Sequence, residues 1–454
     1  MLFSTYLFIF GFLPIALAGY WLLTRYGAAR LWFLLGISLV FYSYWDRRFT
    51  PLLIGSIAVN WTAAEAFFAY QRRAFLIGAV IADLACLGVF KYLGFFESIL
   101  FDSTGWNPSL ARLALPLGIS FFTFHHIIYL VDLLRGRAPR YRLRDYALYI
   151  ALFPQILAGP LVRHREIVPQ FAASPLRPGW DERVARGIAL FVIGLGKKVF
   201  LADALGSVVD LAFRDAANPL PSGEGWTATL GFALQIYFDF SGYSDMAIGL
   251  ALLLGYTLPY NFDVPYRAAS LHDLWRRWHM TLLRFLRDYL FRPLAGAKPS
   301  TARHIAALFA TMVLAGLWHG AGWTFILWGA IHGIGLCVEV LWQRFRLPSP
   351  PIVVGWFLTI AFWTLSAPLF RAPSLAVVGN IYAAIAGFSQ PGPFLGWWTI
   401  LVATAIALLG PSSQAFVEKL QPRAFLIPAA AAATVVVLLA IGDHPSYEFI
   451  YFHF

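Results

Sequence analysis

Residues 303–342 read RHIAALFATMVLAGLWHGAGWTFILWGAIHGIGLCVEVLW, which is two long apolar runs joined by Gly316-Leu-Trp-His-Gly-Ala-Gly. A helix needs about 20 apolar residues to cross roughly 30 Å of hydrocarbon, and each run is close to that length. The join places glycines on both sides of His319, and glycine can interrupt a helix and let a substrate approach the backbone. The stretch therefore predicts two membrane helices with a histidine at the break between them.

Apolar runs of this kind recur along the whole chain of 454 residues. Hydrophobic residues make up 59% and charged residues 13% of the sequence, whereas a soluble domain has about 25% charged residues. We therefore predict one all-α polytopic membrane domain over residues 1–454, with about eleven transmembrane helices plus re-entrant and interfacial helices. The first run lacks the features of a cleaved signal peptide, so we expect it to remain as the first span. The candidate spans cover roughly residues 3–23, 31–45, 51–70, 74–96, 113–134, 146–162, 184–212, 226–256, 303–318, 322–342, 351–368, 375–388, 395–410 and 424–441.

Basic residues in short loops beside the spans account for the net charge of +11. The positive-inside rule and attraction to anionic lipid explain this pattern, so we predict no nucleic-acid partner. In the first half of the chain the basic loops alternate, which predicts that they face the cytosol and that the N-terminus is outside; these loops contain Arg25 with Arg30, Arg72 with Arg73, and the arginines of 135–144. Cys86 and Cys337 lie in apolar runs without a metal or redox motif, and we expect both to be buried.

Two of the candidate spans are interrupted by proline, glycine and polar residues. Residues 115–134 and 146–162 contain, in order, Pro116, Gly118, His125, His126, Asp132, Pro154, Gln155, Gly159 and Pro160. Broken segments at membrane depth are tolerated where they pack against protein or line a watery cavity. We therefore predict re-entrant or cavity-lining helices here.

The segment Leu271–Leu294 has a different pattern. One stripe at helical spacing includes His272, Trp275, Arg276 and His279, and the opposite stripe is richer in polar residues. This pattern predicts an amphipathic helix that lies in the membrane interface near the cytoplasmic surface.

Ionisable side chains inside apolar runs are costly and usually line a substrate path or an active site. The histidines that qualify are His319, His279 and the pair His125 and His126. Histidine suits proton abstraction from a hydroxyl because its pKa lies near neutrality. On the residues alone, His319 is equally well explained as a hydrogen-bond donor in helix packing, and His279 as an interfacial anchor. We expect His125, His126 and also His332 to form hydrogen bonds between helices.

Asp239 and Asp245 are the acidic pair inside an apolar run. We favour a structural role for them, as partners of Arg276 or Arg277. The sequence contains no metal-binding motif, no Gly-x-Ser-x-Gly elbow and no P-loop, which are the usual signatures of metal, serine-nucleophile and nucleotide chemistry. What remains is acyl transfer to an alcohol, driven by a histidine without a metal.

Several stretches occur together and in order along nearly the whole chain. They are Leu115-Pro-Leu-Gly-Ile-Ser-Phe-Phe-Thr-Phe, Phe153-Pro-Gln-Ile-Leu-Ala-Gly-Pro, Phe238-Asp-Phe-Ser-Gly-Tyr-Ser-Asp-Met-Ala-Ile-Gly, Asn261-Phe-Asp-Val-Pro-Tyr, Leu274-Trp-Arg-Arg-Trp-His, Gly316-Leu-Trp-His-Gly-Ala and Phe449-Ile-Tyr-Phe-His-Phe. In this combination the chain resembles the bacterial branch of the membrane-bound O-acyltransferases, the branch that includes alginate O-acetylation.

The resemblance implies a fold in which tilted helices form a ring around a tunnel that holds the active site. It also implies that His319 is the catalytic residue and that His279 is a second functional position. In this interpretation His319 takes the proton of an attacking hydroxyl, while His279 or backbone N–H groups near the glycines stabilise the developing oxyanion. No bound cofactor is expected.

The expected donor is an acyl thioester from the cytosol, most simply acetyl-CoA. Its phosphates suit a basic belt of Arg276, Arg277, Arg284 and Arg287, although attraction to membrane lipid explains this belt equally well.

The expected acceptor is an extracytoplasmic polysaccharide, reached from the bacterial inner membrane with the help of periplasmic acetyltransferase partner proteins. The alternatives are D-alanylation of teichoic acid or O-acetylation of peptidoglycan within the same family, or a transporter whose buried histidines relay protons.

Overall fold

The computed structural model describes residues 1–106, 113–420, 427–443 and 449–450. Across these ranges the regular secondary structure is helical, which confirms the predicted all-α class. Contacts group the chain into two compact units: unit 1 contains Met1–Phe191 and Ser244–Pro259, and unit 2 contains Val192–Tyr243, Tyr260–Leu420 and Pro428–Phe454. The last four residues of the terminal motif and residues 424–426 of the last candidate span lie outside the described residues.

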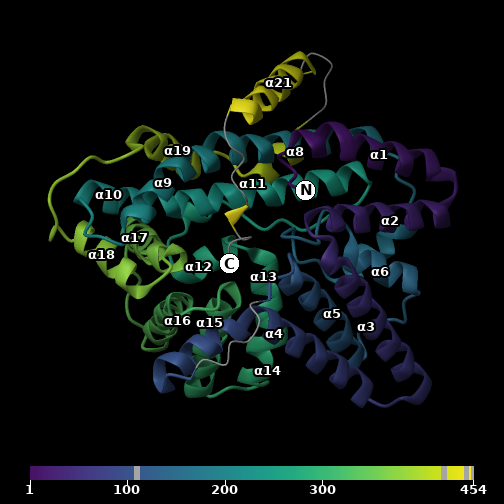
Figure 1. Cartoon of the computed structure of the whole chain (residues 1–454), viewed down its shortest axis with the longest axis horizontal. Coiled ribbons are helices and arrows are strands. Elements are labelled where there is room, and N and C mark those ends of the chain that lie inside the picture. The colour runs from purple at the N-terminus through teal and green to yellow at the C-terminus, as the bar shows by residue number, and fades with distance from the viewer. Residues whose placement is uncertain (107–112, 421–426, 444–448, 451–454) are drawn as a thin grey trace. The chain divides into compact units, whose positions relative to one another are not determined.

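Unit 1 contains the long helices α2 (Gly27–Trp45), α3 (Thr50–Tyr70) and α4 (Ala74–Thr104) together with shorter ones (Figure 1). The helix α3 begins with Pro51 in its first turn and ends at Gln71, which has φ 53°. The helix α4 ends at Gly105, with φ 69°, the left-handed conformation that commonly closes a helix. The helices are η1 (Leu7–Phe12), α1 (Leu13–Leu22), η2 (Leu23–Arg25), α2 (Gly27–Trp45), η3 (Arg47–Phe49), α3 (Thr50–Tyr70), α4 (Ala74–Thr104), α5 (Ile119–Leu134), α6 (Leu143–Ala151), α7 (His164–Ile167), η4 (Val168–Ala172) and α8 (Trp180–Gly196), which continues into unit 2.

The two interrupted spans form the buried part of unit 1. The helix α5 is buried along nearly its whole length, and α6 is followed by an irregular segment, residues 152–163, that is buried throughout. Its backbone is held by side chains, since Phe153 N donates to Ser38 Oγ and the Tyr149 hydroxyl donates to the carbonyl of Val162. The predicted interruption of this span is confirmed, and the segment packs inside protein, but residues 152–163 are irregular and do not form the re-entrant helix that the sequence predicted.

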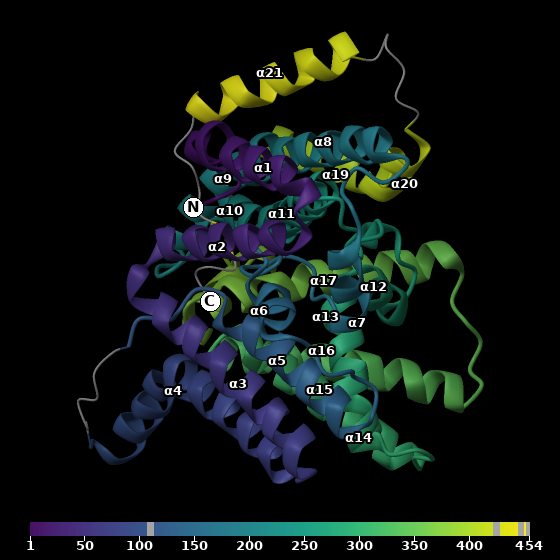
Figure 2. The same ribbon diagram turned by 90° about the vertical axis from the view of Figure 1, so that its right-hand side faces the viewer.

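Unit 2 contains the hairpin of α15 and α16, which lie side by side in Figures 1 and 2. A methyl group at Gly329 would overlap the carbonyl oxygen of Met312, so glycine allows the two backbones to approach closely. The helices are η5 (Lys197–Asp203), α9 (Ala204–Asp215), α10 (Ser222–Trp226), η6 (Thr227–Gly231), α11 (Phe232–Leu253), which continues into unit 1, η7 (Pro265–Arg267), α12 (Leu271–Arg277), α13 (Met280–Phe285), η8 (Leu286–Phe291), α14 (Arg292–Ala295), α15 (Thr301–His319), α16 (Trp323–Arg344), α17 (Ile352–Arg371), α18 (Leu375–Ile385), α19 (Trp397–Leu409), α20 (Ser413–Lys419) and α21 (Ile427–Asp443).

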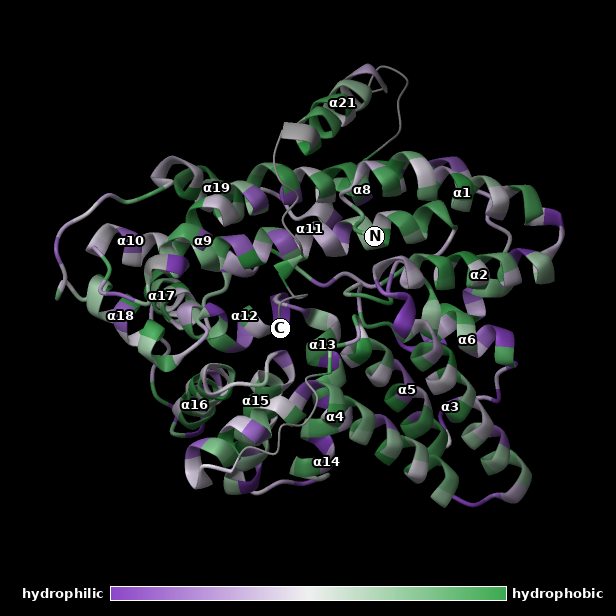
Figure 3. Ribbon diagram, viewed as in Figure 1, coloured by the Kyte–Doolittle hydropathy of each residue, from purple (hydrophilic) through white to green (hydrophobic). Residues whose placement is uncertain are grey.

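Seven helices in the described ranges are long and apolar enough to cross a membrane, or eight if the bent pair α19 and α20 is one span. Figure 3 shows the long helices coloured mainly as hydrophobic. Large apolar side chains such as Phe10, Ile15 and Phe357 are exposed on them, as contact with lipid requires. Other predicted spans fall on shorter apolar helices such as α5 and α18, so fewer helices than the expected eleven are full-length spans by themselves.

The two cysteines differ in burial. Cys86 is half-buried, contrary to the prediction that it is buried, whereas Cys337 is buried as predicted.

The predicted membrane orientation gives the first testable expectation. In a variant that lacks both cysteines, a new cysteine at Ser103 should react with an impermeant thiol reagent added to intact cells. A new cysteine at Arg137 should react after the cells are opened, because the basic loop is expected to face the cytosol. Reaction at position 137 in intact cells would reverse the orientation.

The predicted interfacial helix over Leu271–Leu294 is wrong in one respect. The segment breaks after α12 at Trp278 and His279, and His279 has φ 43°. Leu271, Leu274 and Trp275 are buried, so α12 packs inside unit 2 and does not lie along a surface as one amphipathic helix. The predicted amphipathic stripe is not continuous, because the positive φ of His279 changes the chain direction between α12 and α13.

Candidate active site

His319 is the last residue of α15, so the predicted helix break is confirmed. The next residue, Gly320, has an extended backbone with φ −158°, a conformation that any residue can adopt. Gly316 and Gly320 are explained by the lack of space for a side chain and not by backbone conformations that require glycine. A methyl group at Gly320 would overlap the ring of Phe325, and one at Gly316 would overlap the carbonyl oxygen of the same residue. The glycines therefore let the turn between α15 and α16 close tightly beside His319.

The His319 ring is enclosed by aromatic side chains and is 5% exposed. Trp318, Trp328 and Phe370 meet it edge to face, with ring centroids 4.7, 5.4 and 4.9 Å away. Such contacts fix the plane of the imidazole. A ring nitrogen of an imidazole that carries no proton can accept one from a hydroxyl.

A narrow cavity in unit 2 reaches this imidazole. Its volume is about 20 Å³, enough for a water molecule. The lining is apolar apart from His319 and Ser366 among the residues described, and it consists of Phe232, Ala233, Ile236, Trp278, His319, Trp328, Trp363, Ser366, Ala367 and Phe370. A hydroxyl that enters this space meets one side chain able to take its proton.

His332 has the structural role that the sequence predicted. Its Nε2 atom lies 3.0 Å from Ser366 Oγ, and this hydroxyl donates to the carbonyl of Trp363 at 2.8 Å. Because the serine proton is used on Trp363, its oxygen accepts from the imidazole. The contact joins α16 to α17, which confirms a hydrogen bond between helices.

A loop from a distant part of unit 2 holds His279 in its unusual backbone conformation. Met280 N donates to the carbonyl of Asn261, and the Thr281 hydroxyl donates to the Asn261 side chain at 2.6 Å. Asp263 N donates to the carbonyl of Arg277 on the other side of the break. These contacts clamp both flanks of His279 and position its side chain.

The His279 ring is 2% exposed and lies edge to face against Phe240 at 4.6 Å. Within the described residues neither ring nitrogen has a hydrogen-bond partner. Burial lowers the pKa of His279 to about 3, so the ring is neutral at pH 7. The structure brings Trp278, its chain neighbour, to the same cavity as His319, whereas His279 is not among the lining residues.

Some of the predicted donor-binding arginines form ion pairs with nearby carboxylates. Arg276 is exposed, whereas Arg277 pairs with Asp273 at 3.0 Å. Arg287 is bonded to Asp288 at 2.9 Å. The basic belt therefore keeps a net positive charge with fewer available guanidinium groups than the sequence suggests.

The predicted pairing of Asp239 with Arg276 or Arg277 is wrong. The carboxylate of Asp239 lies 2.8 Å from Lys198 Nζ, and the same ammonium lies 2.8 Å from Asp203. Asp239 also accepts from Ile450 N at 2.7 Å. Sequence reasoning missed Lys198, although a lysine inside the apolar run 184–212 was a signal for a buried partner.

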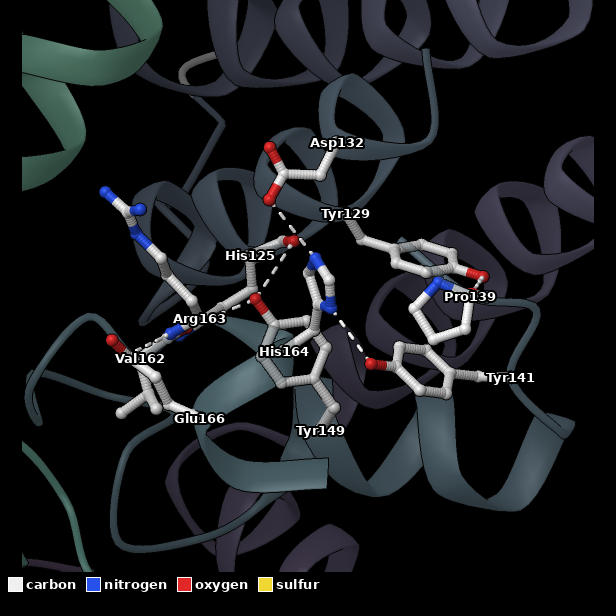
Figure 4. A network of polar contacts seen from close by, with 10 residues as sticks. All are labelled: His125, Tyr129, Asp132, Pro139, Tyr141, Tyr149, Val162, Arg163, His164 and Glu166. Atoms are coloured by element: carbon white, nitrogen blue, oxygen red, sulfur yellow. Dashed lines mark hydrogen bonds and ion pairs between the residues drawn. The ribbon is translucent and has the colours of Figure 1, made fainter. Parts of the chain in front are cut away.

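His126 confirms the expected contact between helices, because its ring nitrogens lie 2.6 Å from the Tyr146 hydroxyl and 3.2 Å from Ser56 Oγ. The ring of His125 packs edge to face on Tyr149 at 5.2 Å. Beside them, sequence reasoning missed His164, which belongs to a polar network in unit 1 (Figure 4).

The fold and the site define a multi-pass membrane protein with a buried histidine at an aromatic cavity. The family model for the membrane-bound O-acyltransferase family, MBOAT, matches residues 112–379. The chain belongs to this family and is an acyltransferase of the bacterial inner membrane. The resemblance stated from the motifs is thereby confirmed.

Named relatives carry several acceptor specificities. The chain is 38% identical to the peptidoglycan O-acetyltransferase of Helicobacter pylori over 86% of this chain and 80% of that protein. It is 40% identical to the probable alginate O-acetylase AlgI of Pseudomonas aeruginosa, over 86% of this chain and 75% of that protein. The teichoic acid D-alanyltransferase of Streptococcus thermophilus is 28% identical over 50% of this chain and 57% of its own length.

Proposed function

We propose that this acyltransferase moves an acetyl group from acetyl-CoA toward a hydroxyl of an extracytoplasmic polysaccharide, with His319 as the general base. The observation that carries the proposal is the position of His319 on the aromatic cavity. Among the lining residues described, His319 is the one whose side chain can accept a proton near neutral pH. The acyl chemistry follows from the family.

The proposed step needs one proton acceptor beside a space that a hydroxyl can enter. A ring nitrogen of His319 takes the proton of the attacking hydroxyl as its oxygen bonds to the carbonyl carbon of the acyl group that the thioester supplies. The proton then passes to the departing thiolate. The surrounding tryptophan and phenylalanine rings hold the imidazole in one orientation, which contributes positioning as well as basicity. His279 is proposed as the second functional residue; it does not line the cavity itself, but its chain neighbour Trp278 does, so its proposed role is to position this wall of the site.

The basic belt is proposed to bind the phosphates of acetyl-CoA. Replacing Arg284 and Arg287 together with glutamine should raise KM for acetyl-CoA about tenfold, the equivalent of about 1.4 kcal/mol, with a smaller change in kcat. That split is expected when a contact binds the ground state and the transition state equally. Steady-state kinetics with acetyl-CoA as the varied substrate measure it.

Arg72 and Arg73, which are both exposed in a basic loop of unit 1, provide the matched control. Their double glutamine variant removes the same charge and should leave KM unchanged. An equal rise of KM in both double variants would favour general attraction between the protein or lipid surface and the donor, and would remove the donor site from the proposal.

The acceptor is proposed from the relatives. Two of them, named for O-acetylation of peptidoglycan and of alginate, match at 38% and 40% identity over most of the chain, whereas the D-alanyltransferase matches half of it. This difference supports acetyl over D-alanyl transfer. Periplasmic acetyltransferase proteins are proposed as partners that complete transfer to the polysaccharide.

Purified protein in lipid vesicles tests the proposal. With acetyl-CoA as donor and the proposed periplasmic acetyltransferase partner supplied, free CoA should appear faster when alginate oligosaccharides or peptidoglycan fragments are added, and mass spectrometry should find acetyl esters on the saccharide. Acetyl transfer to neither saccharide, with D-alanyl transfer from a charged carrier protein in its place, would overturn the acetyl assignment.

A further inference from the structure

Unit 1 contains a linear chain of three polar side chains outside the site described above. The Tyr141 hydroxyl lies 2.9 Å from His164 Nδ1, and His164 Nε2 lies 3.3 Å from a carboxylate oxygen of Asp132 (Figure 4). His164 and Asp132 are buried, whereas Tyr141 is half-buried. The loop before α6, the start of α7 and the end of α5 supply the three residues.

The direction of the hydrogen bonds follows from the chemistry of the groups. An ionised carboxylate only accepts, so His164 Nε2 carries the proton that faces Asp132. His164 Nδ1 is then an acceptor, and the Tyr141 hydroxyl donates to it. This is the arrangement of an activated nucleophile, in which the base contacts the hydroxyl and a third group orients the base.

Other tyrosines of the network lack this arrangement. The hydroxyls of Tyr129 and Tyr149 contact backbone carbonyl groups, those of Pro139 at 3.2 Å and Val162 at 3.2 Å. Tyr146 does contact an imidazole, but it is fully buried and the opposite nitrogen of that ring faces the hydroxyl of Ser56. Among these side chains, Tyr141 is the one that has both a base with a carboxylate behind it and partial exposure.

The surroundings of Tyr141 suit an anionic substrate. Arg137 and Arg142 are exposed on the same loop, and in the described part of the chain neither guanidinium has an ion-pair partner. Their neighbour Arg140 is engaged with Glu65. Burial, with the nearby carboxylate of Asp132, raises the pKa of Tyr141 to about 12. The phenol therefore remains protonated at pH 7 and needs a base in order to attack.

We propose that Tyr141 accepts an acyl group from the thioester donor, with His164 as general base and Asp132 as the positioning residue for that imidazole. The proposal rests on the proposed function, because it uses the same cytosolic donor. The Tyr141 oxygen bonds to the carbonyl carbon, the carbon–sulfur bond breaks, and the phenol proton passes through His164 to the departing thiolate. The products are an O-acyl-tyrosine and the free thiol.

An aryl ester is a good acyl donor, because a phenolate leaves readily. The ester on Tyr141 is then a loaded form of the protein, and passage of the acyl group onward returns the tyrosine to its starting state. Without an acceptor the ester accumulates, and this makes it directly observable.

The test is mass spectrometry of the peptide that contains Tyr141, after full-length protein in lipid vesicles is mixed with deuterated acetyl-CoA and quenched in acid. The wild-type protein should carry the label on Tyr141. Tyr141→Phe should carry none there, and Tyr129→Phe, the matched control on a neighbouring stacked ring, should label normally. His164→Gln should label at least about 10²-fold more slowly, as expected for loss of a general base.

His319→Ala separates this proposal from the proposed function, because it should keep the label on Tyr141 while losing transfer to the saccharide. Transfer that survives in His319→Ala would refute the role of His319 and leave the Tyr141 result to stand on its own. An unlabelled Tyr141 in active wild-type protein, or equal labelling rates in the wild type and His164→Gln, would overturn the acyl-tyrosine. The network would then serve to hold α5, α6 and α7 together.

Discussion

Replacing His319 with alanine should lower acyl transfer per folded molecule by about 10²- to 10⁴-fold, the usual contribution of a general base. The imidazole ends α15, lines the cavity and is held by three aromatic rings, and no other lining residue described can replace it as a proton acceptor near neutral pH. The measurement is acetyl transfer to saccharide, by mass spectrometry, divided by the amount of folded protein. Near-normal transfer by well-folded His319→Ala protein would remove His319 from the mechanism.

His332 provides the control for this experiment. It is a buried histidine in the same unit, within 3.0 Å of Ser366, and is not among the residues that line the cavity. His332→Ala should therefore reduce the yield of folded protein more than the activity of each folded molecule.

His279→Ala gives a second comparison. A smaller loss than in His319→Ala is expected if His279 orients the substrate. A comparable loss in each single variant, with little further loss in the double variant, is expected if the two histidines act as one unit.

The long membrane helices could be predicted from the sequence because their signal is local. An apolar run of about 20 residues implies a span wherever it occurs, and the predicted span 322–342 is close to the observed α16 (Trp323–Arg344). The break at His279 could not be predicted in this way. Its positive φ is held by the hydrogen bonds that Met280 N and the Thr281 hydroxyl donate to Asn261, and no glycine marks the position in the sequence.

For the candidate site too, features with a local sequence signal could be predicted, and contacts between residues far apart in the chain could not. The helix break at His319 could be predicted because glycines stand beside it in the chain, whereas its catalytic role was implied by the family resemblance. The ion pairs of Asp239 were not, because Lys198 and Ile450 are distant in sequence and carry no shared motif. Tyr141 and Asp132 are nearer to His164, at 23 and 32 positions, but they share no motif with it, and their hydrogen bonds depend on how α5 and α7 pack.

Replacing Lys198 with methionine should lower the free energy of unfolding by about 3–5 kcal/mol, the usual cost of removing one partner from a buried ion pair. Lys198 is 5% exposed and lies 2.8 Å from both Asp203 and Asp239, so the variant leaves two carboxylates facing each other without the cation. Denaturant unfolding in detergent micelles measures the change.

Lys197→Met is the matched control for that variant. Lys197 is the adjacent lysine, is half-buried and donates to the Ser413 hydroxyl at 2.7 Å, so its loss should destabilise the protein less. Lys198→Met should also lower activity. Asp239, the partner of Lys198, accepts a hydrogen bond from Ile450 N. The adjacent residue Phe449 packs on Phe240, and the Phe240 ring contacts His279. Equal unfolding free energies for the two methionine variants would show that the cation at position 198 is not needed, and would also break the proposed link from this ion pair to His279.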